Sequence, residues 1–236
     1  MSPTARLALI IVLALASITA VTLAFRYDHE IREALVTAQG KKWKKSDDYK
    51  FYTSVRKFGD YPQILALGIV GLLIAWKMRS REWTRILVAA LIASTLAGML
   101  ANASRLTTGR TRPRESPKIE QGFYGPWHNG KLLIGDPRYN SFPSGHTATA
   151  FGFAGVVLFA SPWIGIAALV PAALIAWASV VIGAHHPSDV TVSIILSLVV
   201  AFFVWRWVRA KGDLTWLLLV RKAKQIRNAR KKAAGK

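Results

Sequence analysis

The sequence contains no cysteine and few acidic residues. Without cysteine, disulfide bridges, thiolate nucleophiles and Cys-ligated metal sites are excluded. Only 12 Asp and Glu residues stand against 32 Lys and Arg residues, so the formal net charge of the 236-residue chain is +20. Such an excess suggests nucleic acid as a partner when it covers a soluble domain. Here the basic residues flank long apolar runs, so membrane topology and anionic lipid headgroups explain the charge better, and we expect no nucleic-acid partner.

Hydrophobic residues make up 52% of the chain, and most of them lie in runs close to the length that crosses a bilayer. We therefore predict an all-α fold, a polytopic bundle of six transmembrane helices with short interfacial helices and an extracytoplasmic active-site loop region. No internal repeat is found. The six predicted spans are residues 7–25, 61–76, 86–103, 143–160, 163–184 and 190–208.

The two ends of the chain allow other interpretations. The first run could be a cleaved signal peptide, with Ala14-Leu15-Ala16 as a small-x-small site. Because the run stays apolar well past that site, we interpret residues 1–25 as the first span. Residues 26–212 are then the membrane core. Residues 213–236 hold an apolar stretch too short to cross the membrane and a polybasic tail, predicted to be disordered against anionic lipid headgroups.

Six spans place both termini on the same side of the membrane. The basic turn at residues 77–85 and the basic tail share that side, which the positive-inside tendency makes cytoplasmic. The active-site loop, residues 104–146, then faces the extracytoplasmic or periplasmic side of the inner membrane. Residues 26–60, broken near Gly40, are predicted to form short amphipathic helices on the membrane surface that take no part in chemistry.

The segment Pro143-Ser-Gly-His146 closes the long loop and opens the fourth predicted span. Pro143 suits the first turn of a helix. The backbone N–H groups of Ser144 and Gly145 would then lie at the positive helix end, where anions bind. His146 beside them can carry a proton near neutral pH. The pattern predicts a phosphate-binding helix start with an acid attached, and a plain helix start with a capping His is the alternative.

Two further polar clusters lie at span ends on the same predicted face. Arg105 and Arg112 carry planar forks that match phosphate oxygens. His185 and Asp189 are four residues apart, so the carboxylate could hold the imidazole tautomer that leaves the other ring nitrogen a free nucleophile. With His146 as the proton donor, these clusters indicate phosphoryl transfer through a phosphohistidine, with no metal and no other cofactor.

Together the three clusters resemble the three-part signature of the type 2 phosphatidic acid phosphatase superfamily. That family includes integral-membrane lipid phosphatases and the soluble vanadium haloperoxidases. The resemblance covers most of residues 28–205. The matching parts, in order, are Arg105-x6-Arg112-Pro113, Pro143-Ser-Gly-His146 and His185-x3-Asp189.

The resemblance implies a role for each matching residue. His185 would be the nucleophile, Asp189 its orienting partner and His146 the general acid for the leaving group. His186 is the alternative nucleophile, but the family spacing to Asp189 selects His185. The groups that would bind the phosphate oxygens are Arg105, Arg112, Ser144, the backbone N–H of Gly145 and the residue at position 179.

Two positions depart from the family pattern. Arg105 stands where the family usually has Lys, which keeps the charge and adds donors. Ser179 stands where the family has a phosphate-binding Arg. The chain could be naturally weak or specialised, the serine could be an engineered substitution, or another basic residue of the loop could replace the arginine. The candidates for such a replacement are Arg110, Arg114 and Arg138.

We therefore predict an integral-membrane, metal-independent lipid phosphatase. The candidate substrates are undecaprenyl diphosphate, phosphatidylglycerol phosphate, phosphatidic acid and the phosphates of lipid A. A lipid phosphotransferase using the same phosphohistidine stays open as an alternative. So does a catalytically silent lipid-phosphate-binding protein, because of Ser179. Haloperoxidase activity is disfavoured because that branch of the family is soluble.

Overall fold

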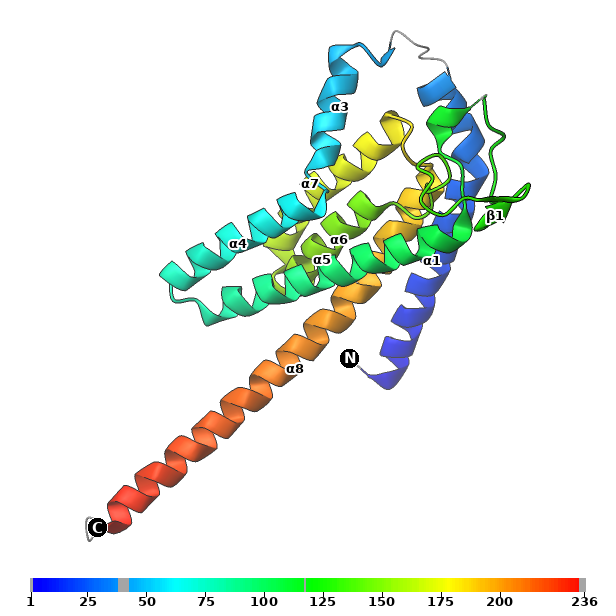
Figure 1. The fold of residues 1–236 in the computed structure, drawn as a ribbon. Coiled ribbons are helices and arrows are strands. Elements are labelled where there is room, and N and C mark those ends of the chain that lie inside the picture. The colour runs from blue at the N-terminus through cyan, green and yellow to red at the C-terminus, as the bar shows by residue number, and fades with distance from the viewer. Residues whose placement is uncertain (1, 38–42, 117, 234–236) are drawn as a thin grey trace.

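The computed structural model describes residues 2–37, 43–116 and 118–233, and it is almost entirely helical (Figure 1). A two-stranded antiparallel hairpin is the sheet found in the described part of the chain. The elements in chain order are α1 (Pro3–Arg32), η1 (Glu33–Thr37), α3 (Asp47–Lys57), α4 (Tyr61–Lys77), α5 (Arg81–Thr108), η2 (Pro113–Glu115), β1 (Trp127–His128), β2 (Lys131–Leu132), α6 (Gly145–Ala160), α7 (Pro162–Val181) and α8 (Pro187–Ala233).

Helix α6 is the centre of the bundle and packs against α5, α7 and α8. Its contact with α5 is close because small residues line both helices. A Cβ on Gly152 would lie 2.9 Å from the carbonyl oxygen of Ala93, so only glycine fits there. The buried hydroxyl of Ser94 donates to the carbonyl of Thr149 at 2.9 Å across the same contact. The small residues of the third predicted span thus allow close helix packing.

Four helical segments are long and apolar enough to cross a membrane: residues 3–36, α5, α7 and the first 25 residues of α8. A fifth is counted if α3 and α4, which meet at an angle of 57°, form one span. Helix α6 is apolar but only 16 residues long. Four of the six predicted runs lie within helices, and the other two, 143–160 and 163–184, extend past the ends of α6 and α7 by two and three residues, while crossing of the membrane by all six stays a prediction.

Two helix boundaries differ from the sequence prediction. Helix α6 begins at Gly145 with Ser144 as its N-cap, so Pro143 precedes the helix instead of opening it. Ser144 makes no side-chain cap hydrogen bond, and its backbone N–H donates outside the helix, to the carbonyl of Asp189. Helix α8 continues to Ala233, so the prediction of a disordered tail is wrong. The added stretch contains no proline and is rich in Ala, Leu, Lys and Arg, which favour helices.

The ends of the helices that carry the predicted motifs meet at one end of the bundle. Helices α1, α5 and α7 end there, while α4, α6 and α8 begin there, and the loop after α5 covers them (Figure 1). Helix α3 packs against α7 at this end. The break predicted near Gly40 lies at residues 38–42, outside the described residues.

Candidate active site

His185 lies in the short connection between α7 and α8, and its side chain is fully buried. Its Nδ1 atom lies 2.7 Å from the carbonyl oxygen of Ser141. A carbonyl oxygen can only accept, so Nδ1 carries the ring proton and the Nε2 lone pair is free in the neutral ring. Nε2 is buried and has no hydrogen-bond partner among the described residues. The imidazole is therefore held in the tautomer that a nucleophile at Nε2 requires.

Burial also keeps this imidazole neutral. It lowers the pKa of His185 from 6.5 to about 3, and the positive charges of Arg112 and Arg105 add to this effect while Asp189 opposes it. A ring with this pKa retains its lone pair throughout the physiological range. The pKa also places both arginines within electrostatic reach of the imidazole.

The lowered pKa of His185 makes a prediction about stability. The unfolded chain binds a proton here below about pH 6.5, whereas the folded chain does not until about pH 3, so stability is lost as the pH falls through this window. From pH 7.5 to 5.5 the loss is about 1.4 kcal/mol. We expect the melting temperature of wild type to fall more steeply over this range than that of His185→Gln. Parallel profiles would contradict the assignment.

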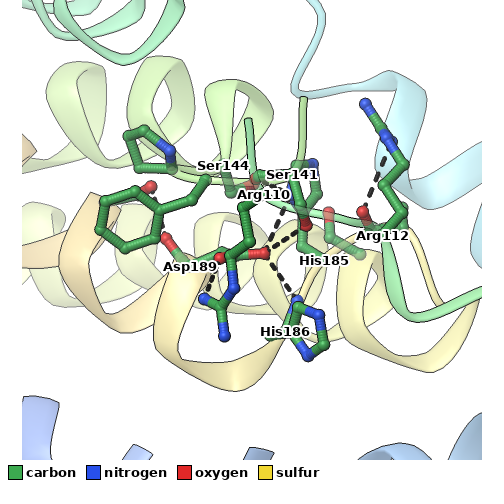
Figure 2. Close-up of polar contacts among 12 residues, drawn as sticks. Arg110, Arg112, Ser141, Ser144, His185, His186 and Asp189 are labelled. Atoms are coloured by element: carbon green, nitrogen blue, oxygen red, sulfur yellow. Dashed lines mark hydrogen bonds and ion pairs between the residues drawn. The ribbon is translucent and has the colours of Figure 1, made fainter. Parts of the chain in front are cut away.

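Asp189, on the first turn of α8, is held by three groups (Figure 2). Arg110 Nη1 and Ser141 Oγ each donate to its carboxylate at 2.5 Å, and the backbone N–H of His186 donates at 2.8 Å. Its nearer oxygen lies 3.7 Å from His185 Nδ1. The sequence predicts Asp189 as the direct partner of Nδ1, but the carbonyl of Ser141 occupies that place. Asp189 orients Ser141 and holds a negative charge beside the imidazole.

Arg110 is the centre of a buried ion network that the sequence did not reveal. Besides Asp189, its guanidinium donates to Asp28 Oδ2, from the end of α1, at 2.6 Å and to Ser188 Oγ at 2.6 Å. Asp28 also accepts from the backbone N–H of Ser188. The network joins α1, the loop and α8. Since Arg110 neutralises two carboxylates, it is not available to replace an arginine at position 179.

The N-terminus of α6 meets Arg105, as predicted. Arg105 Nε donates to the carbonyl of Pro143 at 2.9 Å, and a Cβ on Gly145 would lie 2.8 Å from Arg105 Nη2. This Nη2 is buried and without a hydrogen-bond partner. The N–H of Ser144 is not free, because it donates to the carbonyl of Asp189 at 3.3 Å. The first N–H groups of α6 itself have no partner within the helix, which suits an anion.

Arg112 is buried and reaches the other side of the same region. It donates through Nε and Nη2 to Asn140 Oδ1, at 3.0 and 2.7 Å, and through Nη1 to the carbonyl of Ala184 at 3.4 Å. Burial lowers its pKa to about 9, and the neighbouring charges of Arg114, Arg105 and Arg56 act in the same direction. The structure thus gathers the predicted clusters and shows one further cation near them, Arg56.

His146, on the first turn of α6, contacts two residues from the α3–α4 region. Its Nε2 lies 2.5 Å from Asp60 Oδ1, and its Nδ1 lies 3.2 Å from Arg56 Nη2. Arginine can only donate, so Nδ1 accepts a hydrogen bond from Arg56. Nε2 therefore carries the ring proton and donates a hydrogen bond to Asp60. The sequence assigned residues 26–60 no part in chemistry. The contacts of Arg56 and Asp60 with His146 bring this segment to the predicted site.

Ser179 is fully buried on α7, and its hydroxyl donates to the carbonyl of Ile175 at 2.9 Å. The carbonyl of Ser179 accepts from the backbone N–H of His185 at 3.1 Å. The hydroxyl proton of Ser179 is thus used in a hydrogen bond within α7. Of the two remaining candidates from the loop, Arg138 is half exposed and paired with Asp136, and Arg114 lies 3.5 Å from Glu115.

The PAP2 superfamily model matches residues 83–213, more than half of the chain. The chain belongs to the PAP2 superfamily. This match includes every residue of the three predicted motifs, whereas Asp28, Arg56 and Asp60 lie before it. Sequence reasoning missed these three because each lies far along the chain from its partner. The sequence does hold one indication of Asp28 and Asp60. Each is an acidic residue next to an apolar run, Asp28 after the first predicted span and Asp60 before the second.

Two curated relatives illustrate the likeness. The chain is 29% identical to a lipid A 1-phosphatase of Porphyromonas gingivalis over 178 residues, 73% of this chain and 33% of that protein. It is 31% identical to a lipid A 1-phosphatase of Rhizobium johnstonii over 94 residues, 40% of this chain and 36% of that protein. The chain thus matches about a third of the length of these curated relatives.

Two solved structures share the fold. The crystal structure of Aquifex aeolicus LpxE aligns over 75% of this chain and 93% of its own, with a TM-score of 0.51 and 21% identity. The PAP2-type phosphatidylglycerolphosphate phosphatase of Bacillus subtilis aligns over 84% of this chain and 94% of its own, with a TM-score of 0.52 and 19% identity. At these identities the likeness shows the fold alone.

Proposed function

We propose that this PAP2-superfamily chain is an integral-membrane lipid phosphatase that works through a phosphohistidine on His185. The observation that carries the proposal is the state of that imidazole. Its Nδ1 proton is committed to the carbonyl of Ser141, while its buried Nε2 has no partner. A buried lone pair beside Arg105 and Arg112 suits attack on a phosphorus atom whose oxygens the two guanidinium groups bind.

The reaction would proceed in two displacements. In the first, His185 Nε2 forms a bond to phosphorus, the P–O bond to the lipid breaks, and His146 gives a proton to the departing oxygen. In the second, water attacks phosphorus, its proton passes to His146 and the P–N bond breaks, releasing orthophosphate. Asp60 holds Nε2 of His146, so Nδ1 would carry the donated proton once Arg56 Nη2, which contacts Nδ1 in the structure, has moved away from it, and the Asp60 carboxylate would stabilise the imidazolium. The chain's own residues supply each of these groups without a metal.

An apolar groove supports a lipid substrate. It has a volume of about 600 Å³ and runs between α4, α6 and α7, with Phe58, Ile64, Phe153 and Ile175 among its lining residues. It lies beside the site, since a Cβ on Gly59 would contact both Ile175 and His146. A groove of this kind suits an acyl chain whose phosphate reaches the end of α6. Because relatives are lipid A 1-phosphatases, a 1-phosphate of lipid A type is the first substrate to test.

The test is phosphate release by the purified protein in lipid nanodiscs. We expect release from at least one of lipid A, phosphatidylglycerol phosphate, phosphatidic acid and undecaprenyl diphosphate, unchanged by EDTA and absent in His185→Ala. Release from none of them by folded protein would contradict the proposal, as would release that survives in His185→Ala. A labelled acceptor lipid separates hydrolysis from phosphotransfer, because a transferase moves the label to the acceptor.

A further inference from the structure

The position that the family fills with a phosphate-binding arginine is occupied here by Ser179, whose hydroxyl is bound within α7. A compensating cation must therefore come from elsewhere if the site is to hold a phosphate as its relatives' motif does. Among the loop candidates, Arg110 is committed to Asp28 and Asp189. Arg114, whose charge also acts on Arg112, lies 3.5 Å from Glu115, and a further guanidinium beside the site comes from a different element, α3.

Arg56 lies on the last turn of α3, in contact with the proposed acid. Its Nη2 is 3.2 Å from His146 Nδ1, and its Nε is buried without a hydrogen-bond partner among the described residues. A buried donor without a partner costs free energy unless a ligand satisfies it. Arg105 Nη2 is a buried donor without a partner in the same way, and the lone pair of His185 Nε2 is also unpartnered. Two unsatisfied donors at the end of the bundle that holds the proposed nucleophile suit the oxygens of one phosphate.

The path of the chain brings Arg56 to the side of α7 that carries position 179. At Gly59, just after α3, a Cβ would lie 2.7 Å from Ile175 Cγ2 and 2.9 Å from His146 Cβ. Ile175 is one helical turn before Ser179, so the two residues share a face of α7. The end of α3 therefore crosses α7 beside position 179 and contacts α6 at the phosphate-binding turn.

The charges agree with this placement. Arg56 and Arg105 are both close enough to Arg112 to lower its pKa. Among the acids nearby, Asp60 is paired with His146 and Asp189 with Arg110. Among the described residues, none of these three guanidinium groups forms a salt bridge, although the charge of Asp60 acts on Arg56, and their mutual repulsion favours binding of a multiply charged anion.

We infer that Arg56 is a phosphate-binding residue of this site and takes the place that the family pattern gives to an arginine at position 179. The inference rests on the proposed phosphatase function. It assigns α3, which lies outside the region matched by the PAP2 family, to the substrate site. An arginine at position 179 would extend from α7, whereas Arg56 extends from α3.

Orthovanadate, a phosphate-like oxyanion, is the probe for a binding test by calorimetry in detergent. We expect Arg56→Ala to weaken vanadate binding about 10- to 100-fold, since a hydrogen bond to a charged group is lost. Arg56→Lys should retain part of the affinity, because a charge remains. The matched control is Lys57→Ala, an exposed cation one residue further along α3, which should bind as wild type.

A role for Arg56 in positioning His146 alone would leave vanadate affinity unchanged in Arg56→Ala and would overturn the inference. The double variant Arg56→Ala/Ser179→Arg should recover at least part of the lost affinity. No recovery in a double variant that melts at the wild-type temperature would also overturn it. The binding test separates the two proposals. If vanadate binding requires Arg56 but the protein shows no phosphatase activity, only the proposed function is contradicted. If the protein is an active phosphatase whose vanadate binding does not require Arg56, only the inference is contradicted.

Discussion

Replacement of His185 by alanine is expected to lower kcat for phosphate release by at least about 10³-fold, because the attacking atom is removed. The residual rate would come from the arginines and the N-terminus of α6, which still bind the phosphate. The measurement is steady-state phosphate release from the best substrate of the panel, with the melting temperature of each variant recorded alongside. A kcat within about 10-fold of wild type in a folded His185→Ala protein would rule out this imidazole as the nucleophile.

The covalent intermediate gives an independent measurement of the same assignment. Brief mixing with ³²P-labelled lipid phosphate, followed by denaturation in alkali, should leave label on the wild-type chain that acid removes, as expected for a P–N bond. His185→Ala should carry no label. His186→Ala is the matched control, because His186 is the adjacent imidazole: its Nε2 lies 3.2 Å from the carbonyl oxygen of Thr111, and its Nδ1, like Nε2 of His185, is buried without a partner among the described residues. Label lost in His186→Ala and kept in His185→Ala would reverse the assignment.

Arg110→Ala is expected to destabilise the protein by about 3–5 kcal/mol, because Asp28 and Asp189 would be left as buried charges without a counterion. Among single substitutions of the loop arginines, this is the largest loss of stability that we expect. Thermal unfolding in detergent measures it, as a fall in the melting temperature on the order of 10 °C. Arg110→Lys keeps a charge but loses the fork, so it should fall between wild type and Arg110→Ala.

Arg138→Ala is the control for this prediction. Arg138 also forms an ion pair, at 2.6 Å from Asp136 Oδ2, but more than half of its side chain is exposed. Water screens that pair, so its loss should leave the melting temperature close to that of wild type. Equal stability of Arg110→Ala and Arg138→Ala would show that the buried network does not hold α1, the loop and α8 together.

Much of the site could be predicted from the sequence because local patterns carry it. The spacing of His185 and Asp189 across a Pro-Ser turn places Asp189 on the first turn of α8 and His185 just before it. The Pro-Ser-Gly-His segment places His146 on the first turn of another. The small residues of α5 allow a close helix contact, which the structure shows with α6 at Ala93 and Gly152. These features depend on residues that are neighbours along the chain or that follow helical periodicity.

Partners from distant parts of the chain could not be predicted in this way. The tautomer of His185 depends on the carbonyl of Ser141, 44 residues earlier, and a backbone oxygen leaves no mark in the sequence. Asp28 meets Ser188 across 160 residues. Local patterns do not record such pairings, because the packing of α1 and α3 against the bundle creates them.

The sequence by itself determined that this chain is an apolar helical protein with a phosphate-type motif set and a gap in it at Ser179. Those conclusions need only composition, hydrophobic periodicity and short-range spacing. Only the tertiary structure decided which arginines are free for a phosphate. Arg110 is neutralised by two buried carboxylates. Arg56 contacts His146 through Nη2, and its Nε has no hydrogen-bond partner among the described residues. The physical reason is that a charge is available to a ligand only when the folded chain leaves it without a counterion.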